Sequence, residues 1–192
     1  MCKIIAITNR HLCWQEYETQ IEAICQSGIN AIIVREKDLD ETQYNCLFQK
    51  VKKICDTCHV LCIAHSFPQK NCPNLHMPLY LLRTMSKEQK QSFQQLGTSC
   101  HSVEDAKEAY ELGCTYIVAG HIFPTECKKG LPARGMEFLK EVQQAVPISV
   151  YAIGGINETT IRNLSNPHVC IMSGFMQCRD VKAYMKKLRN EE

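Results

Sequence analysis

Short apolar runs rich in β-branched residues recur along the chain, and most are separated by longer stretches with helical spacing. Several runs are apolar at every position, which is typical of strands buried on both faces of a parallel sheet. These runs predict eight strands, with the weakest pattern in the fourth and fifth: Ile4–Thr8, Ala31–Val34, Val60–Ala64, Leu75–Met77, Leu96–Ser99, Tyr116–Ala119, Ile148–Ile153 and Val169–Met172.

The stretches between these runs predict helices. Ser102 opens one of them with a sequence similar to a capping box, and Gly113 ends it. Residues 66–74 carry two prolines and predict a loop or a single turn instead. The other predicted helices are Glu16–Gln26, Tyr44–Ile54, Met136–Gln144, Glu158–Leu164 and Val181–Leu188.

Eight strands alternating with helices are typical of a (β/α)8 TIM barrel, although 192 residues is short of the usual length of about 250. The alternative is an open doubly wound sheet, which normally has fewer strands at this length. Because no linker, repeat or low-complexity stretch divides the chain, residues 1–192 are expected to form a single TIM-barrel domain. In such a barrel, functional residues follow the C-terminal ends of the strands.

Composition narrows the classes of function. The net charge is +2, with 22 basic residues against 20 acidic ones, which argues against a nucleic-acid partner. The first apolar run is too short for a signal sequence or a membrane span, so we expect a cytoplasmic protein that does not bind membranes. The thirteen cysteines are then expected to be reduced thiols. Cys55-x-x-Cys58-His59 matches a haem or redox pattern, but it falls near the end of a predicted helix and we interpret it as incidental.

Charged, hydroxyl and histidine side chains follow the predicted strands. Arg35 and Lys37 come after the second strand, where they either bind an anion or belong to a solvated loop. His65 follows the third strand, and Ser99 ends the fifth. The sixth strand leads into a segment between glycines that is the richest in candidate chemistry: His121, Thr125, Lys128 and Lys129.

His121 is the candidate catalytic residue. A neutral imidazole at the mouth of a barrel can take a proton and return it elsewhere, and the neighbouring cations could hold an anionic substrate beside it. The alternative is a buried, hydrogen-bonded histidine with a structural role.

Two turns of small residues predict a phosphate site. Gly154-Gly155 follows the seventh strand, and Ser173-Gly174 follows the eighth. In TIM barrels, the loops after these two strands commonly bind phosphate through backbone N–H groups and a helix N-terminus. A glycine pair in a tight turn is weak evidence by itself, but two such turns at the two expected strands are more specific.

Taken together, these segments resemble the thiamine-phosphate synthase/TenI superfamily over nearly the whole chain. The resemblance implies a small phosphorylated thiazole as substrate. The synthase branch joins a thiazole phosphate to a pyrimidine pyrophosphate with Mg²⁺, whereas TenI-type thiazole tautomerases move a proton in a carboxythiazole phosphate without a metal. The matching segments are Val34–Lys37, Gly97–His101, Gly120–Lys128, Ala152–Ile156 and Ser173-Gly174.

The chain departs from the synthase pattern at the metal-binding positions. The Asn-Asp pair of synthases aligns with Ala64-His65, and residues 75–82, where their second metal-binding aspartate falls, contain no carboxylate. Mg²⁺ prefers oxygen ligands, usually carboxylates and phosphates. A further synthase residue, a glutamine, aligns with Ile33. In the sixth-strand loop, His121 takes the position of a proline and Cys127 that of a threonine, which closely resembles TenI proteins.

The leading hypothesis is therefore a thiazole tautomerase, an isomerase of thiamine biosynthesis that aromatises a carboxythiazole ethyl phosphate tautomer with no metal and no cofactor. The resemblance makes His121 the catalytic acid/base and gives the phosphate to Gly154, Gly155, Ser173 and Gly174. The remaining contacts to substrate are expected from Arg35, Lys37, Ser99, Thr125 and Lys128.

Two alternatives stay open. One is a thiamine-phosphate synthase, a transferase, which the missing acids disfavour. The other is a non-catalytic regulatory protein that binds the thiazole phosphate. The resemblance also leaves a homodimer open.

Overall fold

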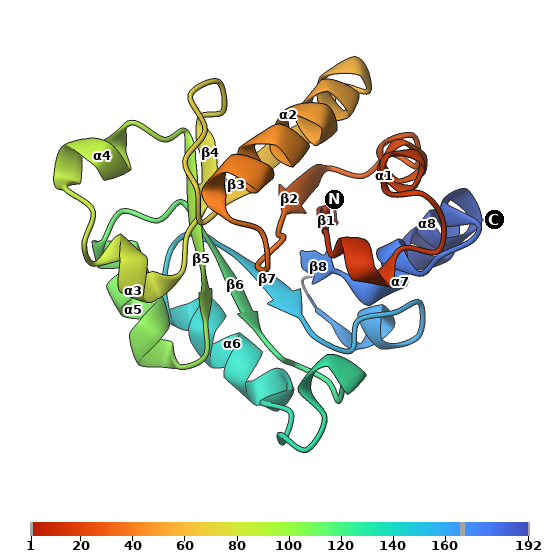
Figure 1. Cartoon of the computed structure of the whole chain (residues 1–192). Coiled ribbons are helices and arrows are strands. Elements are labelled where there is room, and N and C mark those ends of the chain that lie inside the picture. The colour runs from red at the N-terminus through yellow and green to blue at the C-terminus, as the bar shows by residue number, and fades with distance from the viewer. Residues whose placement is uncertain (1, 166–167, 192) are drawn as a thin grey trace.

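Eight parallel strands close into a barrel in the computed structural model, which describes residues 2–165 and 168–191 (Figure 1). Each strand pairs with the next along the chain, and β8 pairs with β1. The predicted TIM barrel is therefore confirmed, and the open sheet is excluded. The strands are β1 Ile4–Ile7, β2 Ala31–Val34, β3 Leu61–His65, β4 Asn74–His76, β5 Gln95–Cys100, β6 Tyr116–Gly120, β7 Ser149–Ile153 and β8 Val169–Ile171.

Helices surround the barrel (Figure 1). The α-helices are α1 Tyr17–Cys25, α2 Glu41–Thr57, α3 Leu79–Leu82, α4 Lys87–Gln91, α5 Val103–Glu111, α6 Gly135–Ala145, α7 Ser173–Met176 and α8 Val181–Arg189. Short 3₁₀ turns add η1 Arg10–Leu12, η2 Glu126–Lys128 and η3 Thr160–Asn163. The helix predicted at 158–164 is only the turn η3, and α2 begins three residues earlier than predicted because Asp40 and Gln43 form a capping box before it.

The strands bury both of their faces. One face packs against the helices, and the other fills the barrel. Gly97 belongs to the inner face, where a Cβ would lie 2.1 Å from the ring of Tyr116, so only glycine leaves room for that ring. The inner core consists of Ile5, Ile7, Ala31, Ile33, Ile63, Tyr116, Val118, Tyr151 and Cys170.

The two-residue period of the strands carries this inner face to the C-terminal mouth of the barrel. Ile33 points inward, so Arg35 and Lys37 continue its row beyond β2. Ile63 points inward in the same way, and His65 ends its row on β3. The ends of two neighbouring strands, β2 and β3, therefore present two cations and one imidazole to the mouth.

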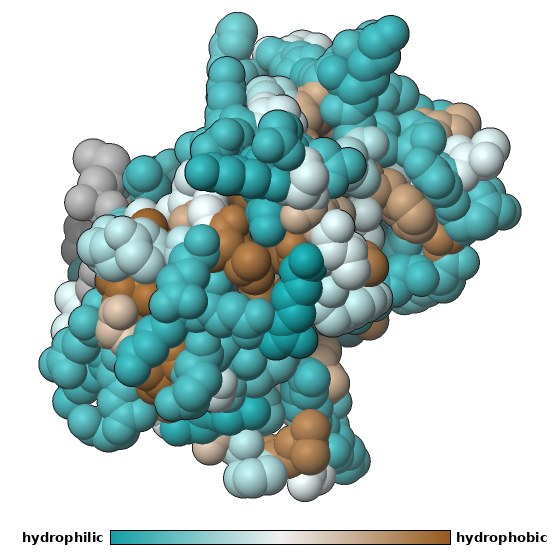
Figure 2. Space-filling view, turned by 90° about the vertical axis from the view of Figure 1, so that its left-hand side faces the viewer, coloured by the Kyte–Doolittle hydropathy of each residue, from teal (hydrophilic) through white to brown (hydrophobic). Residues whose placement is uncertain are grey.

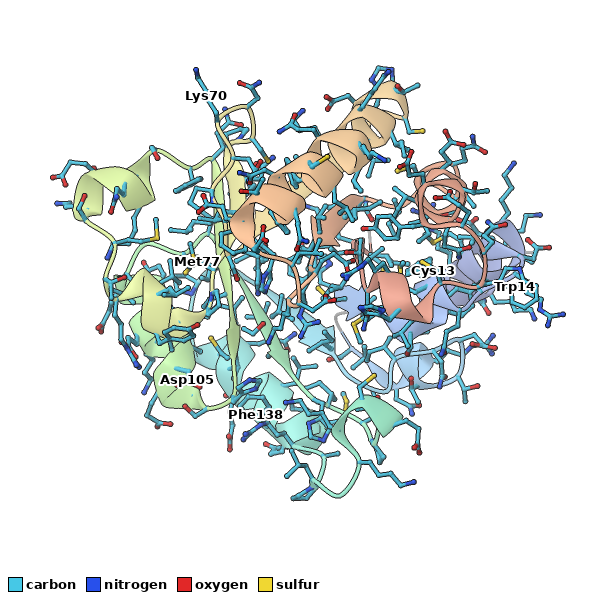
Figure 3. All side chains as sticks on the ribbon, viewed as in Figure 1. Cys13, Trp14, Lys70, Met77, Asp105 and Phe138 are labelled. Atoms are coloured by element: carbon cyan, nitrogen blue, oxygen red, sulfur yellow. The ribbon has the colours of Figure 1, made fainter. Side chains whose placement is uncertain are left out.

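The loop after β1 packs against the last elements of the chain. The Trp14 amide donates to the Met176 carbonyl at 2.9 Å, and the Arg179 guanidinium lies 3.7 Å from the centroid of the Trp14 ring. Figure 3 shows Cys13 and Trp14 on this side of the barrel, near α8. These contacts close the helical layer around the junction of β1 and β8.

No disulfide joins any of the thirteen cysteines, all of which lie among the described residues, and Cys25, Cys62, Cys114 and Cys170 are buried. Among the described residues, no helix is long and apolar enough to cross a membrane. Figure 2 shows a mainly hydrophilic surface on the side that lies at the left of Figure 1, where hydrophobic areas are interrupted by polar side chains.

Candidate active site

Arg35 and Lys37 reach the mouth from a loop that a buried carboxylate holds in place. Glu36 lies between them and points to the opposite side, where it is 3 % exposed. Its Oε1 accepts from the Thr8 hydroxyl at 2.6 Å, and its Oε2 accepts from the Arg10 amide at 3.0 Å. Thr8 Oγ1 in turn accepts from the Arg35 amide at 2.9 Å. The carboxylate thus ties the end of β2 to the end of β1, and the alternation of side chains turns the two cations inward.

A row of hydrogen-bonded polar side chains crosses the mouth from β3 to β6. The rings of His65 and His76 stack with centroids 5.7 Å apart. His76 Nδ1 is hydrogen-bonded to the Tyr116 hydroxyl at 3.1 Å, and its Nε2 to the exposed Ser99 hydroxyl at 3.0 Å. His65 Nδ1 is hydrogen-bonded to Ser66 Oγ at 2.8 Å. His76 therefore connects two of the residues at this site, since it stacks on His65 and is hydrogen-bonded to Ser99.

The electrostatics of the mouth are positive. The charge of Arg35, followed by burial and the charge of Lys128, lowers the pKa of Lys37. Burial, with added repulsion from Arg35 and Lys37, lowers the pKa of His65 to about 4. Mutual repulsion between cations is relieved when an anion binds among them. The part of the mouth around Arg35, Lys37 and His65 therefore suits a negatively charged ligand.

The loop after β6 supplies the remaining predicted residues. His121 is 9 % exposed, and its Nε2 lies 3.4 Å from the Leu131 carbonyl. Thr125 precedes η2 without capping it by its side chain, and Lys128 ends η2 on the exposed surface. The charge of Lys128 lowers the pKa of Lys37, which indicates that the sixth loop and the loop after β2 lie at the same end of the barrel.

The two glycines after β7 pack directly on this sixth loop. Gly154 and Gly155 have φ angles of +95° and +66°, in the left-handed region that favours glycine. A Cβ on Gly154 would lie 2.2 Å from Cβ of His121, and a Cβ on Gly155 would lie 2.5 Å from the Pro124 carbonyl oxygen. The structure therefore brings His121 and the predicted phosphate turn together, and close packing explains both glycines without a ligand.

Ser173 and Gly174 form the start of the short helix α7 rather than a turn before a longer helix. A Cβ on Gly174 would lie 2.3 Å from the Tyr184 hydroxyl of α8. The absence of a side chain at Gly174 is thus required by the packing of α8. Ser173 lies at the helix start, where backbone N–H groups are available to a phosphate.

Sequence reasoning did not predict His76 as a site residue, and it did not predict the linking role of Glu36. The signal for His76 lies in the strand register, which pairs His65 with His76. The signal for Glu36 is its position between two inward residues, which turns it outward toward β1. Both signals depend on knowing which strands are neighbours.

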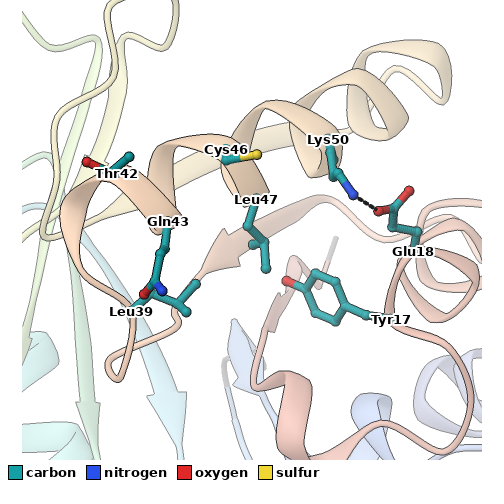
Figure 4. Close-up of a pocket in the computed structure, with 8 residues that line it drawn as sticks. All are labelled: Tyr17, Glu18, Leu39, Thr42, Gln43, Cys46, Leu47 and Lys50. Atoms are coloured by element: carbon teal, nitrogen blue, oxygen red, sulfur yellow. Dashed lines mark hydrogen bonds and ion pairs between the residues drawn. The ribbon is translucent and has the colours of Figure 1, made fainter.

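A cavity of about 470 Å³ lies away from these residues, between α1 and the start of α2 (Figure 4). Tyr17, Leu39 and Leu47 give it apolar walls, and an ion pair between Lys50 and Glu18 lies at one end. None of the predicted site residues lines it.

Relatives with known names match nearly the whole chain. Thiamine-phosphate synthase 2 of Streptococcus pneumoniae is 29% identical over 98% of this chain and 96% of its own length. The thiamine-phosphate synthase of Fusobacterium nucleatum is 28% identical over 97% and 95%. Among solved structures, thiamine phosphate pyrophosphorylase from Pyrococcus furiosus superposes with a TM-score of 0.81 at 23% identity, over 98% of this chain and 94% of that one. This last likeness supports the fold.

The expectation of a thiazole tautomerase is wrong in the light of these relatives, which carry the name of a transferase. The disfavoured alternative, a thiamine-phosphate synthase, is the better supported one. The tautomerase interpretation weighed His121 and the missing acids of residues 65 and 75–82 above the similarity of the whole chain. The packing of Cβ of His121 against Gly154 accounts for the glycine but not for the imidazole, whose Nε2 lies 3.4 Å from the Leu131 carbonyl. The catalytic role of His121 stays a prediction.

The family comparison covers most of the barrel. The family described as thiamine monophosphate synthase matches residues 4–67 and 77–175. These ranges include every predicted site residue, from Arg35 just after β2 to Gly174 in α7. The chain belongs to the thiamine monophosphate synthase family.

Proposed function

We propose that the chain catalyses the condensation named by its relatives, in which a thiazole phosphate and a pyrimidine pyrophosphate give thiamine phosphate. The thiazole nitrogen donates its lone pair to the methylene carbon of the pyrimidine, so a C–N bond forms. The C–O bond to the diphosphate breaks, and inorganic pyrophosphate leaves with that electron pair. No proton has to be moved for this step.

The observation that supports the proposal is that two candidate anion-binding features follow different strands at the same mouth of the barrel. Arg35 and Lys37 lie in the loop after β2, and the charge of Lys128 acts on Lys37 from the sixth loop. The Gly154-Gly155 turn and the start of α7 lie after β7 and β8. A reaction between two phosphorylated molecules requires two such features, and whole-length similarity to synthases supports the same reaction.

In this scheme, the cations bind the diphosphate and stabilise the negative charge that grows on it as the C–O bond breaks. Backbone N–H groups around Gly154, Gly155, Ser173 and Gly174 hold the thiazole phosphate. Ser99 and Thr125 contact the substrates between the two anions. His121 lies beside the phosphate turn, where we assign it to positioning the thiazole.

The residues at the mouth do not fit the Mg²⁺ that the resemblance to synthases implies. That ion prefers carboxylate and phosphate oxygens, whereas β3 and β4 end in His65 and His76. No group of three or more His, Cys, Asp or Glu side chains that could hold a metal ion occurs among residues 2–165 and 168–191. The scheme therefore uses the side chains of the chain itself.

Incubation of the purified protein with the two phosphorylated substrates tests the proposal. We expect thiamine phosphate and pyrophosphate in equal amounts, and a loss of at least about tenfold in kcat/KM for Lys37→Met, since a charge-assisted hydrogen bond is removed. Lys53→Met, an exposed substitution in the last part of α2, is the matched control. Binding of the thiazole phosphate with no product would contradict the synthase and support the non-catalytic alternative.

A further inference from the structure

The neighbouring ends of β3 and β4 carry two imidazoles. The strand register pairs His65 with His76, and their rings are stacked with an interplanar angle of 19°. The resemblance to synthases aligns one of their metal-binding acids with His65 and places a second within residues 75–82, a segment that includes His76. The imidazoles thus occupy the place where a Mg²⁺ site would need carboxylates.

The hydrogen bonds of His76 leave it without a nitrogen for a metal ion. Its Nδ1 is bonded to the Tyr116 hydroxyl and its Nε2 to the Ser99 hydroxyl. A neutral imidazole has one donor and one acceptor nitrogen, so both are used. His65 uses Nδ1 toward Ser66, which leaves Nε2 as the ring atom available to a ligand.

The charges around the two rings favour an anion over a divalent cation. Arg35 and Lys37 both act on His65, and Arg35 also acts on His76. Burial, followed by the charges of His65 and Arg35, lowers the pKa of His76 to about 3, so it is neutral at pH 7 like His65. A divalent cation placed here would be repelled by two cations, whereas a diphosphate would neutralise them.

We infer that the mouth binds the diphosphate of the pyrimidine substrate directly, through Arg35, Lys37 and the Nε2–H group of His65, without a divalent cation. When the Ser66 hydroxyl donates to Nδ1 of His65, the ring proton lies on Nε2, which can donate to a phosphate oxygen. His76, held by Tyr116 and Ser99, supports the His65 ring by stacking. This inference rests on the proposed function.

Calorimetric titration with inorganic pyrophosphate tests the inference without turnover. We expect binding in EDTA, with a Kd that changes by less than about twofold when excess Mg²⁺ replaces the chelator. Titration with Mg²⁺ alone should give no heat of binding. A Kd that weakens about tenfold or more in EDTA, equivalent to about 1.4 kcal/mol, would overturn the inference.

Variants at His65 separate the imidazole from the cations. His65→Ala removes one hydrogen-bond donor, and we expect a two- to tenfold weaker Kd for pyrophosphate in EDTA. His65→Asn keeps a side-chain donor and should restore most of that loss. His65→Asp should bind pyrophosphate poorly in EDTA and regain affinity with Mg²⁺, since it supplies the missing carboxylate. The Tm of each variant is measured first, so that only folded protein is compared. Lys53→Met is the control and should bind pyrophosphate with the same Kd as the unmodified chain. Unchanged affinity in all three His65 variants would contradict the role of His65.

The outcomes distinguish this inference from the proposed function. Product that forms only when Mg²⁺ is present would leave the synthase in place and refute metal-free binding. Pyrophosphate that binds in EDTA, with no product from the two substrates, would support the anion site and refute the condensation.

Discussion

At the scale of single residues, Glu36 links the sequence motif to the direction of its neighbours. Arg35 and Lys37 were predicted from their place after a strand, but a loop of charged residues can point anywhere. The buried carboxylate between them accepts from Thr8 and from the Arg10 amide, and this fixes the backbone that carries both cations. The Tyr17 hydroxyl adds a longer contact to Oε1 at 3.3 Å. Because Glu36 points away from the mouth toward Thr8 and Arg10, its two neighbours Arg35 and Lys37 point into the mouth.

Replacement of this carboxylate tests the argument. We expect Glu36→Gln to lower the free energy of unfolding by about 1–3 kcal/mol, because the new NH₂ group faces the Arg10 donors and leaves them unpaired. Urea denaturation measures the loss, and Glu22→Gln on the exposed face of α1 is the control. A variant as stable as the control, with unaltered pyrophosphate affinity, would show that Glu36 does not position the loop.

At the scale of elements, the eight strands were predicted to within two residues at each end because continuous apolar runs are a strong signal. The short helices were harder. α3, α4 and α7 hold four, five and four residues and lack the length over which helical periodicity can be read. The stretch 158–164 has the apolar residues of a helix, but only the four-residue 3₁₀ turn η3 forms there.

The N-terminus of α2 is marked by a capping box, which a pattern of apolar residues alone does not reveal. Asp40 accepts from the Gln43 amide at 2.9 Å, and Gln43 reaches back to the Asp40 amide. We expect Asp40→Ala to cost about 1 kcal/mol of stability, since a helix loses its N-cap. The exposed Thr42→Ala in the same turn is the matched substitution, and equal urea midpoints for the two variants would contradict a capping role.

At the scale of the whole molecule, the site is assembled from strands far apart in the chain. The strand-end rule predicts Arg35, Ser99, His121 and Gly154 as site residues without any knowledge of their contacts. It could not give the stacking of His65 on His76, because that depends on the closed strand order and register. The function was misjudged for a related reason. Single substituted positions in the motifs favour a tautomerase, whereas similarity over the whole chain favours a synthase.

The two buried histidines give the molecule a pH dependence of stability. Their pKa values of about 4 and 3 lie below the ordinary value, so between about pH 6 and pH 4 the unfolded chain binds protons that the folded chain does not. Stability therefore falls as the pH falls, with about 1.4 kcal/mol per pH unit from each histidine at full effect. Urea midpoints measured across this range should show a shallower decline in His65→Asn. An identical slope in that variant would contradict the contribution of His65.

The contact between Gly154 and Cβ of His121 also limits how the barrel can diversify. Loops at the mouth of a TIM barrel usually vary independently, which lets one scaffold acquire new specificities. Here the sixth and seventh loops touch backbone to backbone, with the Phe123 amide donating to the Gly154 carbonyl at 3.0 Å. A change in the length or course of either loop displaces the other. During evolution or in directed libraries, these two loops are therefore expected to change as a pair, while specificity is free to drift at the ends of the remaining strands.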